Sequence, residues 1–128
     1  TVQTTGKIFE MVDKIAEKQQ KQALELYYDL LALKEPPMRI LFLIARQFGI
    51  LLQVKDLRQQ GYDNKFIASK VKIPEFAVRK NMAQAGRFTL KQLKEAVEDC
   101  VQREEEVKTE SLNDRMAVEL LIVRHSRK

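Results

Sequence analysis

Few side chains in this sequence have the types and spacing that catalysis or metal binding needs. The chain has one cysteine, Cys100, and one histidine, His125. Two such ligands are too few for a structural zinc site, and a single cysteine excludes an internal disulfide. No serine or cysteine is paired with a histidine as a nucleophile, and no glycine-rich loop could hold phosphate. We therefore expect no catalytic residue, metal ion or cofactor, and the composition favours a binding or assembly module over an enzyme.

The remaining chemically active side chains have simpler interpretations. Three consecutive glutamates, Glu104 to Glu106, could bind a cation, but successive side chains on a helix point in different directions. We interpret this run as a solvated helix face. Cys100 lies on an apolar stripe and is expected to be a small core residue rather than a reactive thiol. The sequence pattern gives His125 no specific role.

Charge is distributed unevenly along the chain, although the net charge is only +5. Residues 65–94 contain eight basic side chains and one acidic side chain, a net charge of +7. Residues 95–106 contain one basic and six acidic side chains, a net charge of −5. Such a polarised surface could steer an anionic partner. Two solvated helix faces that neutralise each other would give the same pattern, and both interpretations stay open.

The basic stretch contains a pattern that resembles a helix-turn-helix. Its small core would consist of the apolar side chains at 67, 71, 73 and 78, with Ala68 allowing two helices to cross closely. The second helix would carry basic residues where DNA-binding proteins of this type contact DNA. The candidate nucleic-acid contacts are Lys72, Arg79, Lys80 and Arg87. Two features weaken this interpretation: Lys72 stands where the turn usually has glycine, and the second helix offers few side chains that read bases. An ordinary helical hairpin fits equally well, and we prefer it.

The elements that position these residues are all predicted to be helices. Only four glycines and three prolines are present, too few for an all-β fold with many turns. Apolar periodicity predicts helices over 5–18, 19–33, 37–60, 63–70, 74–85, 89–107 and from 111 or 113 onward. The first two are either one bent helix or an antiparallel pair, and Thr4 or Thr5 is expected to cap the first. Gly61 and Gly86 are expected to end the third and fifth helices.

The helix over 37–60 is apolar on nearly every side, so we expect other helices to surround it. The fold class is therefore all-α: a compact bundle of six or seven helices around one long buried helix, forming a single domain over residues 1–128. Four side chains of this helix are expected to be nearly fully buried: Leu43, Ile44, Leu51 and Leu52. Its polar side chains form a narrow stripe: Arg39, Arg46, Gln53 and Gln60. Gly49 lies on the stripe, where it either admits a neighbouring backbone or is merely tolerated, and tolerance is favoured.

The location of the protein is inferred from what the sequence lacks. No charged-then-apolar leader is present, so no secretory signal is expected. The longest apolar run, from Ile40 to Ala45, is too short to span a bilayer. We expect a cytoplasmic protein without a membrane partner. Because the first residue is Thr1 rather than methionine, we interpret the chain as a piece of a longer protein.

Several stretches, taken in order, resemble one protein family. They are Ile8-Phe9-Glu10-x-Val12-Asp13-x-Ile15, Ala23-Leu24-x-Leu26-x-x-Asp29-Leu30-Leu31, Pro37-x-Arg39-Ile40-Leu41-x-Leu43-Ile44-Ala45-Arg46-Gln47-Phe48, Leu51-Leu52-Gln53-Val54-Lys55, Ile67-Ala68-x-x-Val71-x-Ile73-Pro74-x-Phe76-Ala77-Val78-x-Lys80 and Val107-Lys108-Thr109. From about Ile8 to Val123, their order and spacing resemble the C-terminal third of delta subunits of bacterial DNA polymerase III. The pattern departs from the family at Gly49, where a basic residue is usual, and at Lys72 and Glu110, where glycine is usual.

The resemblance implies a role in assembly. Delta subunits belong to the clamp loader, which opens the sliding clamp and places it on primed DNA during DNA replication. The family has three domains: the first two together resemble an AAA+ module without a working nucleotide site, and the third is helical. This chain resembles that third domain alone. In the family, such domains pack together in a closed collar of five subunits. The candidate subunit contacts are Arg39, Arg46, Gln53 and Lys108.

The resemblance also implies which partners and activities to expect. The partners would be other clamp-loader subunits, namely delta prime and tau or gamma. The sliding clamp and DNA would be reached only through the full-length protein and its complex. The fragment would be no enzyme, although its parent subunit belongs to a holoenzyme classed as a DNA-directed DNA polymerase. The alternative function is a helix-turn-helix module that binds nucleic acid.

Overall fold

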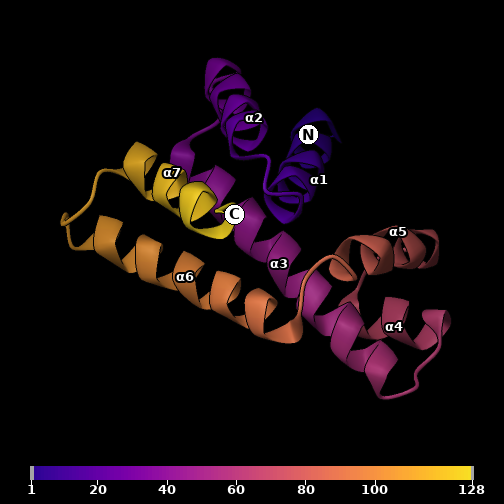
Figure 1. Cartoon of the computed structure of the whole chain (residues 1–128). Coiled ribbons are helices and arrows are strands. Elements are labelled where there is room, and N and C mark those ends of the chain that lie inside the picture. Colours follow the sequence, from indigo (N-terminus) through magenta and orange to yellow (C-terminus); the bar gives the residue numbers. More distant parts are fainter. Residues whose placement is uncertain (1, 128) are drawn as a thin grey trace.

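A computed structural model describes residues 2–127, which form seven α-helices (Figure 1). Their bounds are α1 Val2–Ala16, α2 Gln20–Ala32, α3 Pro37–Gln59, α4 Asn64–Val71, α5 Glu75–Ala85, α6 Leu90–Lys108 and α7 Asp114–His125. The all-α prediction is confirmed. Because α1 already begins at Val2, Thr4 and Thr5 lie inside the helix, and the prediction that either caps it is wrong. The fifth helix is predicted to begin at Pro74, but Pro74 is the N-cap of α5, which begins one residue later at Glu75.

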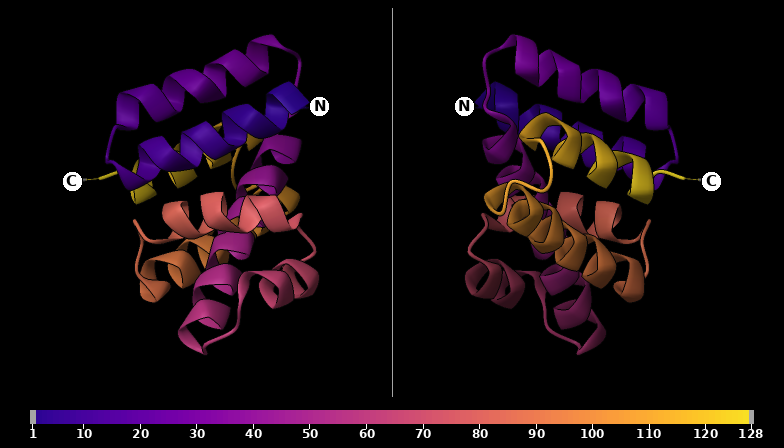
Figure 2. Two further views of the ribbon diagram at one scale, coloured as in Figure 1. Left: turned by 90° about the vertical axis from the view of Figure 1, so that its right-hand side faces the viewer. Right: turned by 90° about the vertical axis from the view of Figure 1, so that its left-hand side faces the viewer.

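Helix α3 is the centre of the bundle and packs against all six other helices. In Figure 1, α6 and α7 lie along one side of α3, and α4 and α5 lie beside its C-terminal half. Figure 2 shows α1 and α2 side by side, with α2 uppermost in both views. They form an antiparallel pair, so the alternative of one bent helix is wrong. The long apolar helix is surrounded as expected.

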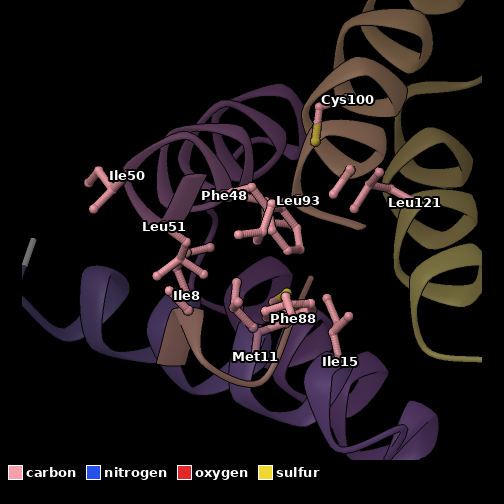
Figure 3. Packing of buried hydrophobic residues seen from close by; sticks show 14 of the residues in the cluster. Ile8, Met11, Ile15, Phe48, Ile50, Leu51, Phe88, Leu93, Cys100 and Leu121 are labelled. Carbon is pink, nitrogen blue, oxygen red and sulfur yellow. The ribbon is translucent and has the colours of Figure 1, made fainter. Parts of the chain in front are cut away.

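The core is a single cluster of buried apolar side chains to which all seven helices contribute. Figure 3 shows part of this cluster. In α3, Ile44 and Leu51 are completely buried, as predicted. Leu43 and Leu52 are only partly buried, so for these two residues the prediction is wrong. The reason is that α3 has a wider exposed face than its polar stripe indicates, since Phe42 is 59% exposed.

The ends of the helices follow local sequence signals. Asp63 caps α4 by accepting a hydrogen bond from the Phe66 N–H, and Thr89 forms a reciprocal capping box with Gln92 at the start of α6. Gly61 has a φ of 94° just after α3, the left-handed conformation expected of a glycine after a helix. At Gly49, an added Cβ would meet nothing within 4 Å, which supports a tolerated glycine over a close backbone approach.

Other helix C-termini place residues other than glycine in the left-handed region. Lys18, Lys34, Lys72 and Glu110 have φ values of 62°, 69°, 66° and 61°. Lys72 and Glu110 are the two positions where the family resemblance leads us to expect glycine. A side chain there costs about 1–2 kcal/mol because its Cβ approaches the following carbonyl oxygen. Two of the three departures from the family pattern therefore fall at strained turns, and the third, Gly49, lies within α3.

Lys72→Gly is expected to raise the free energy of unfolding by about 0.5–1 kcal/mol. Removing the Cβ relieves the left-handed strain, and this gain exceeds the added backbone entropy of glycine in the unfolded chain. Urea denaturation followed by circular dichroism measures the change. Lys70→Gly, at an exposed position inside α4, is the control and is expected to lower stability by about 1 kcal/mol. Equal losses in the two variants would contradict the prediction.

Cys100 is a buried core residue on α6, as expected. Burial raises the pKa of the Cys100 thiol to about 12, and the neighbouring carboxylates of Asp99 and Glu104 contribute to the shift. At mildly alkaline pH, the native thiolate population is therefore about a thousandfold below that of an unperturbed thiol. We expect a disulfide reagent to leave the native protein unmodified and to react fully once guanidinium unfolds it. Rapid modification of the native protein would refute this prediction.

Candidate functional site

The exposed face of α3 brings three predicted contact residues together. Arg39, Arg46 and Gln53 are all exposed there, at the spacing that the sequence predicts. Arg39 lies 3.5 Å from the Glu35 carboxylate, and Gln53 donates a hydrogen bond to the carbonyl oxygen of Gly49. Lys108 is not part of this face, because it ends α6 and pairs with Glu104 at 3.6 Å.

Phe42 belongs to the same exposed face and is not singled out by the sequence pattern, which counts it among the apolar core side chains. Its spacing could have indicated this place, because Phe42 follows Arg39 by three residues and precedes Arg46 by four. Side chains at those spacings are neighbours on a helix surface. The face therefore presents an aromatic ring between two guanidinium groups. Arginine and aromatic residues are both enriched in protein–protein interfaces.

Beside this face lies a groove between α1, α3 and α5 with a volume of about 600 Å³. Its apolar lining includes Leu43 and Ile50 from α3 and Phe76 from α5. The charged side chains that line it are Arg46 and Lys80, both basic. The structure thus places Arg46, a predicted subunit contact, in one groove with Lys80, a predicted nucleic-acid contact.

A network of amide side chains fixes the three helices around the groove. Gln47 on α3 donates hydrogen bonds of 2.8 Å to both Asn81 and Gln84 on α5. Gln84 donates in turn to the Asp13 carboxylate and to the carbonyl oxygen of Phe9, both on α1. Asn81 and Gln84 are buried, and Asn81 also donates to the backbone of its own helix. Buried polar groups with their partners satisfied hold neighbouring elements in one arrangement.

The four predicted nucleic-acid contacts have different surroundings. Lys72 is in the left-handed turn after α4, and Arg79 is exposed on α5. The Lys80 ammonium lies 4.1 Å from the centre of the Phe9 ring. Arg87 lies 2.8 Å from Glu17 and 3.5 Å from Asp13, so it ties the segment after α5 to α1. The residues of the helix-turn-helix pattern lie on α4, α5 and the turn between them, with Ile67 and Val78 buried.

The comparisons with known proteins decide the family. The family model described as "DNA polymerase III delta subunit, C-terminal domain" matches residues 5–125. The chain belongs to this family. Over 116 residues it is 35% identical to the DNA polymerase III subunit delta of Bacillus subtilis (strain 168). This match covers 91% of this chain and 33% of that protein. The resemblance inferred from the motifs is thereby confirmed.

A solved structure agrees with this assignment of the delta C-terminal domain. The Bacillus subtilis DNA clamp loader delta protein matches with a TM-score of 0.91 and 33% sequence identity. The match covers 98% of this chain and 37% of that one. The chain therefore spans about a third of the length of the relatives that it matches. The seven-helix arrangement is that of the matching part of the clamp-loader protein.

A second polar cluster joins α6 and α7 of this delta C-terminal domain. The Asp99 side chain is 9% exposed, and its carboxylate lies 2.9 Å from His125 Nε2. Arg103 and Arg124 each approach the same carboxylate to 3.6 Å. His125 thus has a specific structural contact, contrary to the sequence interpretation. No local signal relates Asp99 to His125, because they are 26 positions apart and on different helices.

Three further observations concern the predictions about metal ions, membranes and the glutamate run. Within residues 2–127, no group of three or more histidine, cysteine, aspartate or glutamate side chains is arranged to hold a metal ion. Among the helices of the same residues, none has the length and hydropathy needed to cross a bilayer. Glu104 to Glu106 are divided between the solvent and ion pairs with Arg103 and Lys108. The exposed α3 face with its adjoining groove is the candidate site because it brings Arg39, Arg46 and Phe42 together beside a concave apolar surface.

Proposed function

We propose that this chain is the collar domain of a clamp-loader delta subunit, a non-catalytic fragment of an AAA+-like protein. In this role it packs against other clamp-loader subunits, delta prime and tau or gamma, and so supports loading of the sliding clamp in DNA replication in the cytoplasm. Contact with the clamp and with DNA belongs to the full-length protein and its complex. Membership in the delta family supports the proposal. The observation that carries it is the exposed α3 face.

This face has the features of a contact surface rather than of a core. The central helix of a bundle would ordinarily be covered, yet Phe42 is 59% exposed beside Arg39 and Arg46. None of the ion pairs among residues 2–127 involves Arg46. Arg46 therefore has no acidic partner there that would explain it as a stabilising residue. A planar guanidinium on an aromatic-rich surface is suited to a partner's carboxylate.

Arg46→Ala separates a contact role from a stabilising role. We expect the unfolding free energy of the chain to change by less than about 0.5 kcal/mol, because an exposed side chain without an ion pair is removed. Affinity for the other clamp-loader subunits of the same organism is expected to fall about fivefold to tenfold, as for interface truncations near 1 kcal/mol. Thermal unfolding and surface plasmon resonance measure the two quantities. Lowered stability with unchanged affinity would contradict the collar role.

The alternative function, a nucleic-acid-binding helix-turn-helix, is favoured by the α4–α5 hairpin and the basic charge of residues 65–94. A module of this kind should bind duplex DNA by itself, with affinity falling steeply as salt rises. A collar domain should bind the other subunits and show only weak, general attraction to DNA. Arg79→Ala combined with Lys80→Ala distinguishes the two. Loss of sequence-selective DNA binding in this variant would establish the alternative.

A further inference from the structure

We propose that the groove between α1, α3 and α5 receives an amphipathic helix of a neighbouring clamp-loader subunit, with acidic residues beside its apolar face. This inference rests on the proposed collar function and assigns a surface and a partner chemistry to it. The groove has a volume of about 600 Å³ and opens beside the exposed α3 face. An amphipathic helix in an apolar groove is a recurrent mode of protein recognition.

The apolar part of the groove is the first argument. Phe76 lines it and is 86% exposed, the highest exposure among the large apolar side chains of residues 2–127 that lie outside the core. Leu43 and Ile73 also line the groove and are only partly buried. Apolar side chains gathered along one concave surface indicate a binding site for an apolar partner, whereas single exposed ones do not. Phe76 would anchor the partner helix.

Charge complementarity specifies the partner further. Arg46 on α3 and Lys80 on α5 are the charged residues that line the groove, and none of its lining residues is acidic. The contact with the Phe9 ring holds the Lys80 ammonium at the groove, 4.1 Å from the ring centre. Opposite charges across an interface fix its register and exclude wrong partners. The docked helix should therefore place aspartate or glutamate next to its apolar residues.

The combination of charge with apolar surface favours protein over nucleic acid. Phosphate groups would use Arg46 and Lys80 but would leave the apolar lining formed by Leu43, Ile50 and Phe76 without a partner. Specific protein–DNA interfaces are more polar and more positively charged than this groove. A helix with mixed apolar and acidic residues satisfies both parts of the lining.

The groove is also rigid before the partner arrives. The hydrogen bonds of Gln47 to Asn81 and Gln84, and of Gln84 to α1, hold the three groove helices together. Pro74, with φ −61° and ψ 146°, sets the start of α5 and hence the place of Phe76. A preformed surface lowers the entropy lost on binding. Docking therefore needs no rearrangement of this domain.

The test uses the 128-residue chain and the other clamp-loader subunits of the same organism. Phe76→Ala is expected to weaken binding about tenfold or more, as for an aromatic anchor, and to leave thermal unfolding unchanged because the ring is exposed. The double variant R46E and K80E is expected to weaken binding at least as much.

Val101→Ala, at a 62% exposed position on α6, is the apolar control. The double variant K65E and K91E, at exposed positions outside the groove, is the charge control. Neither control should change affinity.

A photoreactive benzoylphenylalanine at position 76 identifies the occupant. We expect a cross-link to another clamp-loader subunit, mapped to a helical segment that contains aspartate or glutamate. A cross-link to a second copy of this chain or to DNA would overturn the proposal. If the unsubstituted chain binds the subunits and Phe76→Ala binds equally well while Arg46→Ala binds more weakly, the groove assignment is wrong and the collar function stands. If the unsubstituted chain binds none of them, both are overturned.

Discussion

Leu51→Ala is expected to lower the free energy of unfolding by about 2–5 kcal/mol. Leu51 is completely buried on α3, the helix that packs against all the others. The loss combines the transfer free energy of the removed carbons with the cavity that they leave. Because α3 is held between the other helices, the site should have little freedom to collapse around the cavity. Urea denaturation followed by circular dichroism gives the value.

Phe42→Ala is the matched control, since it removes a larger side chain from the same helix at a 59% exposed position. It should change stability by less than about 0.5 kcal/mol, apart from the small difference in helix propensity. A loss below about 0.5 kcal/mol for Leu51→Ala would mean that the core lies elsewhere.

Asp99→Ala is expected to cost about 2–3 kcal/mol, because it removes a carboxylate that several cationic or polar groups share. His125 lies 2.9 Å from the carboxylate, and Arg103 and Arg124 lie 3.6 Å from it. The Arg103 side chain is 8% exposed, and its guanidinium would keep only its contact with Glu106. Leaving a buried charge with fewer partners is the main source of the loss. Chemical denaturation measures the loss.

The control for Asp99→Ala is Glu98→Ala, which makes the same change of charge one position away on the exposed side of α6. It should be nearly neutral, since alanine suits a helix and no buried partner is lost. If the two variants lose equal stability, the cluster contributes only general charge. If His125→Ala lowers stability while Asp99→Ala does not, histidine packing rather than the ion cluster joins α6 to α7.

The helices could be predicted because their signals are local. Asp63, Thr89 and Gly61 mark helix ends through contacts with residues a few positions away. The exposure of Leu43 and Leu52 could not be predicted in the same way. Periodicity shows which side chains share a helix face, but the packing of distant helices decides which faces are covered. The family resemblance singled out Lys72 and Glu110 as positions where glycine is expected, and the structure shows that both are left-handed.

The sequence predicted the α3 face of the candidate site but not the groove beside it. The spacing of Arg39, Arg46 and Gln53 gave one face of α3, and Phe42 falls on that face by the same rule. The groove depends on α1 and α5, which meet α3 through contacts far apart along the chain, such as Gln84 with Phe9. The contacts of Arg87 with α1 and of Asp99 with His125 are also long-range. No window of sequence contains both partners of such a contact.

The central position of α3 has a consequence for how the domain opens. A helix that packs on six others cannot detach without exposing the surface of all of them, so its backbone amides should exchange with solvent deuterium only through global unfolding. The α4–α5 hairpin, by contrast, packs chiefly on α3, and the amide network of α5 adds its link to α1. Opening of α4 exposes far less surface. The domain should therefore behave as one cooperative unit with a less protected corner at residues 64–71.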